Sequence, residues 1–547
     1  MAGLATTLGS GAMTNSIGDI TEASVLLVVG SNTTEAHPVI SLRMKAAVRR
    51  HGARLILIDP RGIELAQFAD LHLRPRPGTD VAVLNAMAQV ILAEGLENRP
   101  FIAARTENVE ALAQAVAGWT PERAEDISGV PAESIRQAAR AYAGARAAAI
   151  FWAMGVTQHV SGTDNVMALS NLALLSGQIG RPGTGLNPLR GQNNVQGACD
   201  MGGLPNVFPA YQAVTSEEAR LKFAAGWGVA VESLSDRPGL TVTEMMDAAL
   251  EGRLRALLIL GENPMLSDPN LHHVELALAA LDLLVVQDIF LNETAAVADV
   301  VLPGVSFAEK SGTFTNTERR VQLVRPALPV RGEARQDWAI LSDLARRLGA
   351  TWDYRAPSDV FDEMARLTPS YVGMSHARLE GGGLQWPCPT ADHPGTPILH
   401  VERFTRGRGW FSPVEYRPPV ETTDADYPFI LSTGRILFHW HGGTLSRRSA
   451  GLDWLAPEAE IEIHPEDAEA LGISQGETVE VRSRRGVVRA RSRLTVRSPR
   501  GTVFMTFHFA EAAANLLTVG AVDPVAKIPE YKVAAVRVER VAEATPA

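Results

Sequence analysis

The sequence has very little cysteine and no long hydrophobic run. Only Cys199 and Cys388 are present among its 547 residues, far apart and in no CxxC arrangement. The printed chain therefore offers no cysteine cluster for zinc or an iron–sulfur centre and no disulfide framework, which fits a reducing compartment. No uninterrupted apolar stretch approaches the roughly 18 residues that a membrane-spanning helix needs, so we expect no direct membrane insertion.

A basic face and a dinucleotide-binding fingerprint are also missing. The formal net charge is −10, and an acidic chain without a basic patch is not expected to bind nucleic acid. No GxGxxG segment is present, which disfavours a conventional NAD-binding fold. The proportions of apolar and charged residues are those of a globular protein.

Strand-like apolar runs alternate with helical stretches in the first part of the chain. Three runs predict buried strands, at 24–30, 53–61 and 147–155. Alanine- and leucine-rich segments predict helices at 80–95, 107–117, 132–145 and 163–179. Continuous apolar strands joined by helices indicate a parallel sheet with both faces covered. The pattern recurs with strand-like runs at 254–264, 281–290 and 298–304, which predicts a second α/β unit.

The last part of the chain changes character. From residue 425 the apolar segments are short and separated by glycine and proline, which is typical of a compact β-barrel. We therefore predict an α/β fold class with two Rossmann-like parallel-sheet domains, a mixed connecting segment and a C-terminal barrel. The predicted domains, of which the second is partial, are 1–192, 193–304, 305–420 and 421–547.

Polar residues follow the first predicted strands at the points where they end. Gly30 and Asn32 follow the first strand, Asp59 and Arg61 end the second, and Asp80 opens a helix. Ligands of open parallel sheets bind at the carboxyl ends of the strands, where helix N-termini can receive a phosphate. Two plainer interpretations stay open, because Asp59 suits an Asp-Pro turn and Asp80 suits a helix cap.

The later strands also end in polar residues. These are Gly155, Gln158, Gly261, Glu262, Asn263, Gln287 and Asp288. Taken one at a time, each of these residues is better explained by a structural role than by a role in ligand binding. Their joint occurrence at strand ends favours two nucleotide-sized sites that face one another.

Residues 188–206 read PLRGQNNVQGACDMGGLPN and surround Arg190 with neutral amides. An ordinary surface loop can have this composition. The alternative is a wall of hydrogen-bonding groups, Gln192 among them, that holds a polar ligand and a small anion. Cys199 lies in the same run without a nearby histidine, so we expect a buried, inert thiol.

His439 and His441 flank Trp440, so on a strand the two imidazoles would share one face. That spacing could bind a metal, but no third ligand is nearby. Polar contacts to a bound organic cofactor, together with Thr444 and Ser446, are the favoured interpretation. A partly buried structural pair is the alternative.

Seven segments, in order over essentially the whole chain, resemble the molybdenum- or tungsten-dependent formate dehydrogenase large subunits of the molybdopterin oxidoreductase family. They are GSGAMTNSI (9–17), WAMGVTQH (152–159), PLRGQNNVQGACDMGGLPN (188–206), LILGENP (258–264), VVQDIFLNETAAVADVVLP (285–303), GTFTNTERRVQ (312–322) and DPVAKIPEYKVAAVRVE (523–539). The RGQNNVQGACDMG run is characteristic of the formate dehydrogenases within that family.

The resemblance implies a bis(molybdopterin guanine dinucleotide) cofactor with molybdenum or tungsten, held by two α/β domains and capped by a six-stranded barrel of the double-psi type. One guanine nucleotide would be held by Gly30, Asn32, Asp59 and Asp80. The other would be held by Gly155, Gln158, Gly261, Glu262, Asn263, Gln287 and Asp288. The barrel residues that would close over the pterins are Thr433, Gly434, Arg435, His439, Asn515, Tyr531 and Lys532.

The resemblance also gives Arg190 a role, because the matching arginine lies by the metal and holds the carboxylate of formate. A guanidinium suits this carboxylate through its planar fork of donors, and it stays cationic while CO2 forms. Gln192 and the neighbouring asparagines would fix Arg190 with neutral hydrogen bonds.

The sequence also departs from the family. Members carry the metal-ligating cysteine or selenocysteine, and a cysteine cluster for [4Fe–4S], before the segment that matches the start of this sequence. We therefore expect both upstream, in an N-terminal iron–sulfur segment, with no metal ligand in the printed chain, which would be inactive alone. An in-frame UGA codon that is read as a stop instead of selenocysteine would explain why the gene is divided at this point. A misplaced start and a true truncation are alternatives.

The leading hypothesis is a formate dehydrogenase catalytic subunit that converts formate to CO2 in the cytoplasm, although export through an upstream signal stays open. Its expected partners are electron-transfer subunits: an NAD-reducing diaphorase, a hydrogenase or a ferredoxin. The alternatives are another molybdopterin oxidoreductase, such as a nitrate reductase, and a non-catalytic pterin-binding or split-gene subunit.

Overall fold

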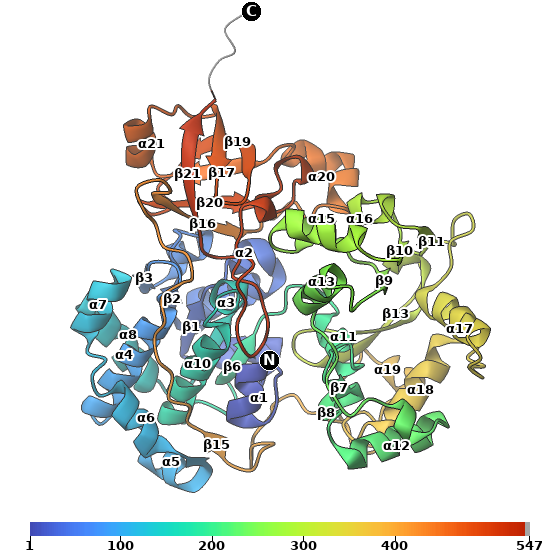
Figure 1. Ribbon diagram of the computed structural model, residues 1–547. Coiled ribbons are helices and arrows are strands. Elements are labelled where there is room, and N and C mark those ends of the chain that lie inside the picture. The colour runs from blue at the N-terminus through green and yellow to red at the C-terminus, as the bar shows by residue number, and fades with distance from the viewer. Residues whose placement is uncertain (542–547) are drawn as a thin grey trace, which may run out of the picture. The chain divides into compact units, whose positions relative to one another are not determined.

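The computed structural model describes residues 1–541, which group into two units (Figure 1). The first unit holds residues 1–189 and 266–272, together with the described chain from residue 398 onward. The second unit holds residues 190–265 and 273–397. The first unit therefore combines residues of the first predicted domain with the C-terminal barrel, and the four-domain division stays a prediction.

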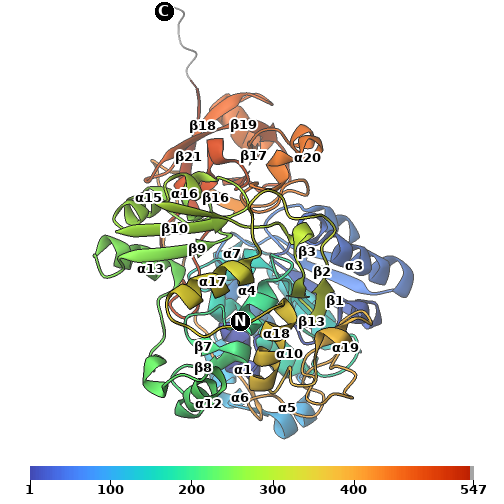
Figure 2. The ribbon, with the colours of Figure 1, turned by 90° about the vertical axis from the view of Figure 1, so that its right-hand side faces the viewer.

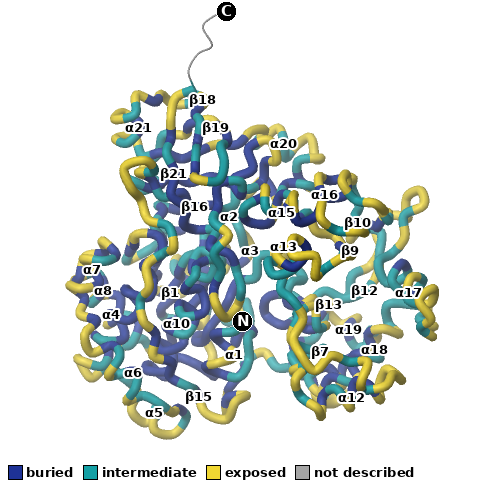
Figure 3. Tube along the Cα trace, in the orientation of Figure 1, coloured by how far each residue is buried: buried dark blue, intermediate teal, exposed yellow. Residues whose placement is uncertain are grey.

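A parallel sheet of five strands forms the centre of the first unit, in the order β3-β2-β1-β5-β6. Its strands are β1 (Val25–Val29), β2 (Arg54–Ile58), β3 (Leu71–Leu73), β5 (Ala148–Trp152) and β6 (Gly185–Pro188). All residues of β1 and β5 are buried (Figure 3). Helices cover both faces of this sheet, as the continuous apolar runs predict.

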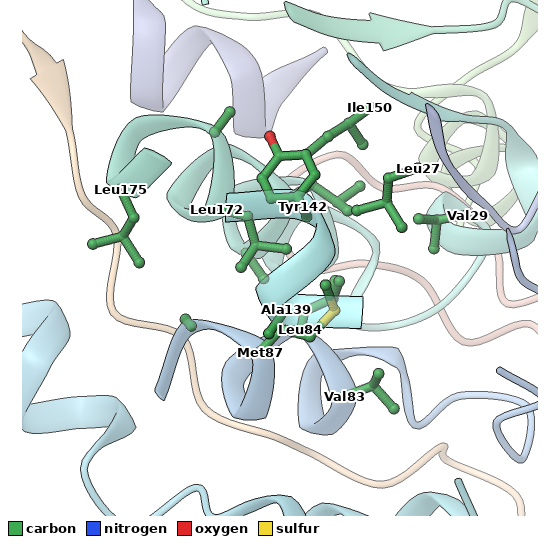
Figure 4. Packing of buried hydrophobic residues seen from close by; sticks show 14 of the residues in the cluster. Leu27, Val29, Val83, Leu84, Met87, Ala139, Tyr142, Ile150, Leu172 and Leu175 are labelled. Atoms are coloured by element: carbon green, nitrogen blue, oxygen red, sulfur yellow. The ribbon is translucent and has the colours of Figure 1, made fainter. Parts of the chain in front are cut away.

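Alternate residues of β1 pack against different helices. Leu27 and Val29 point to a core made with α4 (Asp80–Ala93), α8 (Ala132–Ala143) and α10 (Gly162–Ser176), part of which is seen in Figure 4. Leu26 and Val28 face the opposite core, which includes Met44 of α3 (Pro38–His51). The period of two along the strand therefore determines which helix each side chain meets.

Shorter helices complete the α/β part of the first unit. They are α1 (Ala2–Leu8), α2 (Thr33–Ala36), α5 (Arg99–Arg105), α6 (Val109–Val116), α7 (Pro121–Ser128) and α9 (Met154–Thr157). A two-stranded parallel ladder pairs β4 (Thr106–Glu107) with β15 (Gly409–Trp410).

Six strands close into a barrel in the C-terminal part, in the order β16-β20-β17-β19-β18-β21. They are β16 (Phe429–Gly434), β17 (Glu460–Ile463), β18 (Thr478–Arg482), β19 (Val487–Leu494), β20 (Thr502–Thr506) and β21 (Ala534–Arg540). In β19, Val488 and Ala490 are buried while Arg489 and Arg491 are exposed. Apolar residues therefore face inward, and closure leaves no unpaired edge. Two helices, α20 (Ala450–Leu455) and α21 (Pro465–Leu471), connect these strands.

A second parallel sheet, ordered β11-β10-β9, lies in the second unit (Figure 2). Its strands are β9 (Ala256–Leu260), β10 (Leu283–Asp288) and β11 (Val300–Pro303). One face packs against α13 (Val242–Leu250), α15 (Leu271–Ala279) and α16 (Glu293–Ala296) through residues such as Ile259 and Val286. Leu258 and Leu283 of the other face are exposed. The two covered faces expected of the first sheet are therefore present, whereas the second sheet has one face that is exposed at these positions.

The rest of the second unit is mixed. Its strands form the hairpin β7 (Val207–Phe208) and β8 (Gln212–Ala213), and an antiparallel sheet of β12 (Gly312–Thr315), β13 (Arg320–Val324) and β14 (Leu384–Gln385). Its helices are α11 (Val195–Asp200), α12 (Glu217–Trp227), α17 (Asp337–Arg347), α18 (Pro357–Leu367) and α19 (His376–Leu379), and α14 (Pro264–Ser267) spans the unit boundary.

The predicted fold class is confirmed. Both predicted parallel sheets form, the region after residue 304 is mixed, and a six-stranded closed barrel follows. Within residues 1–541, none of the helices has both the length and the apolar character needed to cross a membrane.

Candidate functional site

Two buried carboxyl groups lie where the first sheet ends. Asp59 follows β2 and Asp80 opens α4. Burial raises the pKa of Asp59 to about 6, and the charge of Asp80 adds to this effect, while the backbone N–H of Arg61 donates to Asp59 Oδ1 at 2.9 Å and opposes it. Burial also raises the pKa of Asp80. Two carboxyl groups in this environment are suited to accept hydrogen bonds from the N–H or O–H groups of a polar ligand.

Arg61 links the sheet to the barrel. Its Nη2 atom lies 2.8 Å from Oε2 of Glu462 on β17, and both side chains are less than a tenth exposed. The guanidinium carbon stands 3.3 Å from the ring centroid of Phe504 on β20. These contacts give Arg61 a structural partner at the position predicted to bind cofactor.

The amide of Asn32 is buried at the start of α2, directly after β1. Neither Oδ1 nor Nδ2 has a hydrogen-bond partner within residues 1–541. Buried polar groups in proteins are almost always paired, because an unmade hydrogen bond costs free energy. A polar ligand at this strand end would supply both missing partners.

Gly30 and Gly155 bring the ends of β1 and β5 together. The Gly155 N–H donates to Gly30 O at 3.0 Å. A Cβ on Gly155 would lie 2.5 Å from that oxygen, and one on Gly30 would lie 2.6 Å from Val156 Cγ2. Both predicted site glycines are therefore required for close packing, whatever else they contact. Gln158 follows at the end of α9 and is half-buried.

A cationic group from the barrel belongs to the same unit. Lys532 is buried and donates from Nζ to Thr433 O at 2.6 Å. Burial lowers its pKa to about 7; Arg435 and Arg61 lower it further, whereas Asp59 raises it. Burial also lowers the pKa of Arg435 to about 10. Cations close enough to repel one another are suited to an anionic ligand such as a diphosphate.

Other predicted barrel residues contact the protein backbone. Thr433 Oγ1 donates to Tyr531 O at 2.8 Å, and Tyr531 Oη donates to Ser267 O at 2.9 Å. Asn515 Nδ2 donates to Leu266 O and Ser267 O, while its Oδ1 is buried with no partner in the described chain. Gly434 ends β16, in contact with Phe504.

His439 and His441 do not lie on a strand, so the shared face that a strand would give them does not form. Turns at 437–438, 441–442 and 444–445 shape this segment, with His441 at φ 43° and Gly443 at φ 76°. Both ring nitrogens of His439 are occupied, Nδ1 by Ser446 Oγ at 3.2 Å and Nε2 by Ala456 O at 2.7 Å. His441 Nε2 lies 3.1 Å from Arg435 Nη2, and Thr444 O accepts from Arg448. His439 and Ser446 therefore hold this loop in place.

The strand ends of the second unit carry a separate group of predicted residues. Asn263 Oδ1 accepts from Thr294 Oγ1 at 2.7 Å, and Asp288 Oδ2 accepts from Asn292 at 2.9 Å. Gln287 donates to Asp337 Oδ1, while its Oε1 is buried without a partner in the described residues. Gly261 and Glu262 are exposed beyond β9.

Arg190, half-buried in the second unit, is held by a residue that the sequence interpretation did not select. Gln196 Oε1 accepts from Nε at 3.2 Å and from Nη2 at 3.1 Å, and the Arg190 N–H donates to Thr317 Oγ1 at 3.2 Å. Gln196 is fully buried, whereas Gln192, the predicted support, is exposed. Cys199 is buried, and burial raises the pKa of its thiol, as expected of an inert side chain.

Comparison with known proteins decides the family. The molybdopterin oxidoreductase model matches residues 3–347, and the "Molydopterin dinucleotide binding domain" model matches residues 429–535. The chain belongs to the molybdopterin oxidoreductase family. Members of this family are oxidoreductases that use a molybdenum or tungsten pterin cofactor.

Three curated relatives cover almost the whole chain. The F420-dependent formate dehydrogenase 1 subunit alpha of Methanococcus maripaludis is 49% identical over 99% of this chain and 80% of its own length. The corresponding alpha subunit of Methanocaldococcus jannaschii is 50% identical with the same coverage. Formate dehydrogenase H of Escherichia coli is 41% identical over 99% of this chain and 76% of its own length.

A solved structure shares the fold. Acetylene hydratase from Pelobacter acetylenicus has a TM-score of 0.79, covering 99% of this chain and 80% of that one, at 20% identity. At this identity the similarity shows the molybdopterin oxidoreductase fold alone.

The residues of the first unit fit the cofactor of this molybdopterin oxidoreductase. The unpaired Asn32 amide, the buried carboxyl groups of Asp59 and Asp80, and the buried Lys532 would be suitable partners for the polar groups of such a cofactor. No group of three or more His, Cys, Asp or Glu side chains within residues 1–541 could hold a metal ion.

Proposed function

We propose that this chain is the catalytic subunit of a formate dehydrogenase that oxidises formate to CO2. The half-buried Arg190 carries the proposal, because Gln196 holds its guanidinium and the planar fork of donors of a guanidinium suits a carboxylate. The alpha subunits that are 49% and 50% identical to this chain support the same substrate.

The chemistry divides between cofactor and protein. Formate, HCOO⁻, loses its C–H bond and yields CO2, one proton and two electrons. The molybdenum or tungsten pterin supplies the two-electron acceptor when it is bound. Arg190 binds the carboxylate through paired N–H donors and orients the C–H bond. Because a guanidinium does not titrate near neutral pH, Arg190 takes no proton as the carboxylate charge disappears.

The cofactor in this proposal is bis(molybdopterin guanine dinucleotide). Asn32, Asp59 and Asp80 of the first unit would hold one guanine nucleotide. Gln287 and Asp288 of the second unit would help to hold the other, and the unpaired Gln287 Oε1 supports this assignment. Lys532 and Arg435 would neutralise the phosphates.

Electron-transfer partners are part of the same proposal. Two relatives bear the name of alpha subunits, which supports assembly with other subunits. An NAD-reducing diaphorase, a hydrogenase, a ferredoxin or an F420-dependent subunit could accept the two electrons. A [4Fe–4S] segment would carry them out of the site.

The test is turnover by the metal-loaded complex, produced from its natural locus with the neighbouring reading frames. We expect formate to reduce a viologen dye and expect nitrate not to oxidise the reduced dye. Nitrate turnover without formate turnover would assign a nitrate reductase instead. Stoichiometric metal and pterin with neither activity would support a non-catalytic pterin carrier.

A further inference from the structure

A buried hydrogen-bond network lies behind Arg190 in the second unit. Gln196 joins Arg190 to Asp200, the last residue of α11. Asp200 is fully buried, as is Gln196. A carboxylate at such a position needs a physical reason, because taking a charge out of water costs free energy unless strong hydrogen bonds compensate.

Four donors converge on Asp200. Gln196 Nε2 and Tyr211 Oη each lie 2.8 Å from Oδ1. Tyr371 Oη lies 2.5 Å from Oδ2, and Trp386 Nε1 lies 2.7 Å from the same atom. An indole N–H and an amide NH2 can only donate, so the arrangement requires Asp200 to accept. Burial raises the pKa of Asp200, and these four hydrogen bonds oppose the rise.

The guanidinium, which can only donate, and the carboxylate together determine which end of the Gln196 amide meets Arg190. An amide has one accepting and one donating end of nearly equal size, so packing alone does not orient it. Because Asp200 accepts, Nε2 must point toward it and Oε1 must point toward the guanidinium. The reverse orientation would place two sets of N–H donors against each other.

We propose that Asp200 is the positioning residue of Arg190, acting through the polarity of the Gln196 amide. This inference rests on the proposed function and deepens it, since a fixed guanidinium presents its donors to a carboxylate in one geometry. That the Gln196 amide is neutral is equally important for binding a carboxylate. A carboxylate in place of Gln196 would neutralise the guanidinium and compete with formate, whereas the Gln196 amide orients Arg190 without adding a negative charge.

The hydrogen-bond partners of Asp200 come from separate segments of the chain, which restricts the motion of the network. Tyr371 follows α18 and Trp386 follows β14, 171 and 186 residues away from Asp200 in sequence. Tyr211 also accepts from Gln196 Nε2 at 2.8 Å and has a φ of 63°, an uncommon value for a non-glycine residue. Several anchors on one carboxylate restrict its motion, and through Gln196 they restrict Arg190.

The first test is the isosteric variant Asp200→Asn in the metal-loaded complex. Asparagine can donate as well as accept, so it no longer supports the orientation in which the Gln196 amide presents Oε1 to Arg190. We expect the KM for formate to rise about tenfold, which corresponds to about 1.4 kcal/mol, with kcat changed by less than about threefold. The effect falls on KM because formate loses the negative charge that Arg190 binds as it reacts. Tyr371→Phe removes one donor and keeps the carboxylate, so its KM should stay within about twofold of the wild type.

The second test separates positioning from general disturbance of structure. If Asp200 acts through Gln196, Asp200→Asn should add less than about twofold to the KM of Gln196→Met, because the amide is already gone. Multiplying effects in the double variant would overturn the proposal. Gln196→Met alone should raise KM, and this variant keeps the test open if Asp200→Asn does not fold.

The third test does not depend on turnover. In the full chain labelled with ¹⁵N-arginine, the Nε–H signal of Arg190 is assigned by its loss in Arg190→Lys. We expect it to move in Asp200→Asn and to stay in place in Tyr371→Phe. An unmoved signal and an unchanged KM in a folded Asp200→Asn variant would overturn the inference. If Arg190→Lys itself leaves the KM for formate unchanged, the proposed function fails instead.

Discussion

At the scale of single residues, several buried side chains have an environment that suits a chain with a bound ligand better than a chain without one. Asn32 has a buried amide without a partner in the described residues, and Lys532 is a buried amine whose pKa is lowered by burial and by the charges of Arg435 and Arg61. Such groups lower stability unless a ligand compensates them. A mutation that removes such a group should therefore stabilise the cofactor-free chain and reduce the amount of cofactor that the holoenzyme retains.

Asn32→Leu should separate these two properties. A leucine of similar volume removes the unmade hydrogen bonds, so we expect the cofactor-free chain to gain about 1–2 kcal/mol in free energy of unfolding. The pterin and metal content of the purified holoenzyme should fall. Asn85→Leu is the matched control, because Asn85 Nδ2 donates to Val414 O at 2.9 Å. That variant should lose stability, and an equal loss in Asn32→Leu would contradict the assignment.

Lys532→Met should change the pH dependence of stability. Burial lowers the pKa of Lys532 from 10.5 to about 7, whereas the unfolded chain keeps the usual value. Between these pKa values unfolding takes up a proton, so the lysine destabilises the fold progressively as pH falls through this window, to a constant extent below it.

We therefore expect Lys532→Met to raise the free energy of unfolding of the cofactor-free chain by about 1–3 kcal/mol at pH 7, and the difference to vanish near pH 10.5. Urea unfolding at the two pH values measures it. A difference that does not vary with pH would show that the lysine is not held uncharged. In the holoenzyme the same variant should lose phosphate contacts and retain less cofactor.

At the scale of helices and strands, the sequence predicts the central elements well. The predicted strand at 24–30 is β1 (Val25–Val29), and the predicted helix at 80–95 is α4 (Asp80–Ala93). These elements are long apolar or periodic segments whose burial is evident locally. The histidine segment after β16 is different, because two alternating positions are too few to specify a strand, and positive φ values at His441 and Gly443 turn the chain.

The support of Arg190 shows which part of a site is hidden from the sequence. Gln196 and Asp200 are four residues apart on α11, a spacing that places them on one helix face. That contact could have been predicted. Tyr371 and Trp386 come from distant segments of the second unit without any local signal, and only the tertiary fold brings them to Asp200. The strand-end residues and Arg190 therefore stay predictions from the sequence, whereas the supporting residues from distant segments could not have been predicted from it.

The buried ion pair between the loop after β2 and strand β17 is predicted to contribute to the stability of the first unit. Breaking the buried Arg61–Glu462 pair with Glu462→Gln leaves Arg61 without its charge partner. We expect thermal unfolding to show a loss of about 2–4 kcal/mol at neutral pH. The control is Asp282→Asn, whose partner Arg255 is exposed; that loss should be below about 0.5 kcal/mol. Equal losses would contradict a structural role for Arg61.

At the scale of the whole molecule, the described chain contains two parallel α/β sheets and a closed barrel, and it belongs to the molybdopterin oxidoreductase family. The sheets place their polar residues at strand ends, and the barrel adds Lys532 and Arg435. A likeness of fold extends to an acetylene hydratase, so the fold does not determine the reaction. Selection of the substrate must come from side chains near the reacting atoms, and Arg190 is the proposed one.

Formate kinetics of Arg190→Lys in the metal-loaded complex test this account most directly. Lysine keeps the positive charge but loses the planar fork, so we expect kcat/KM for formate to fall about 100-fold, or about 2.7 kcal/mol. Metal and pterin content should equal that of the wild type, since Arg190 is assigned to the substrate. Unchanged kcat/KM with full metal content would contradict the assignment of Arg190 and the substrate deduced from it.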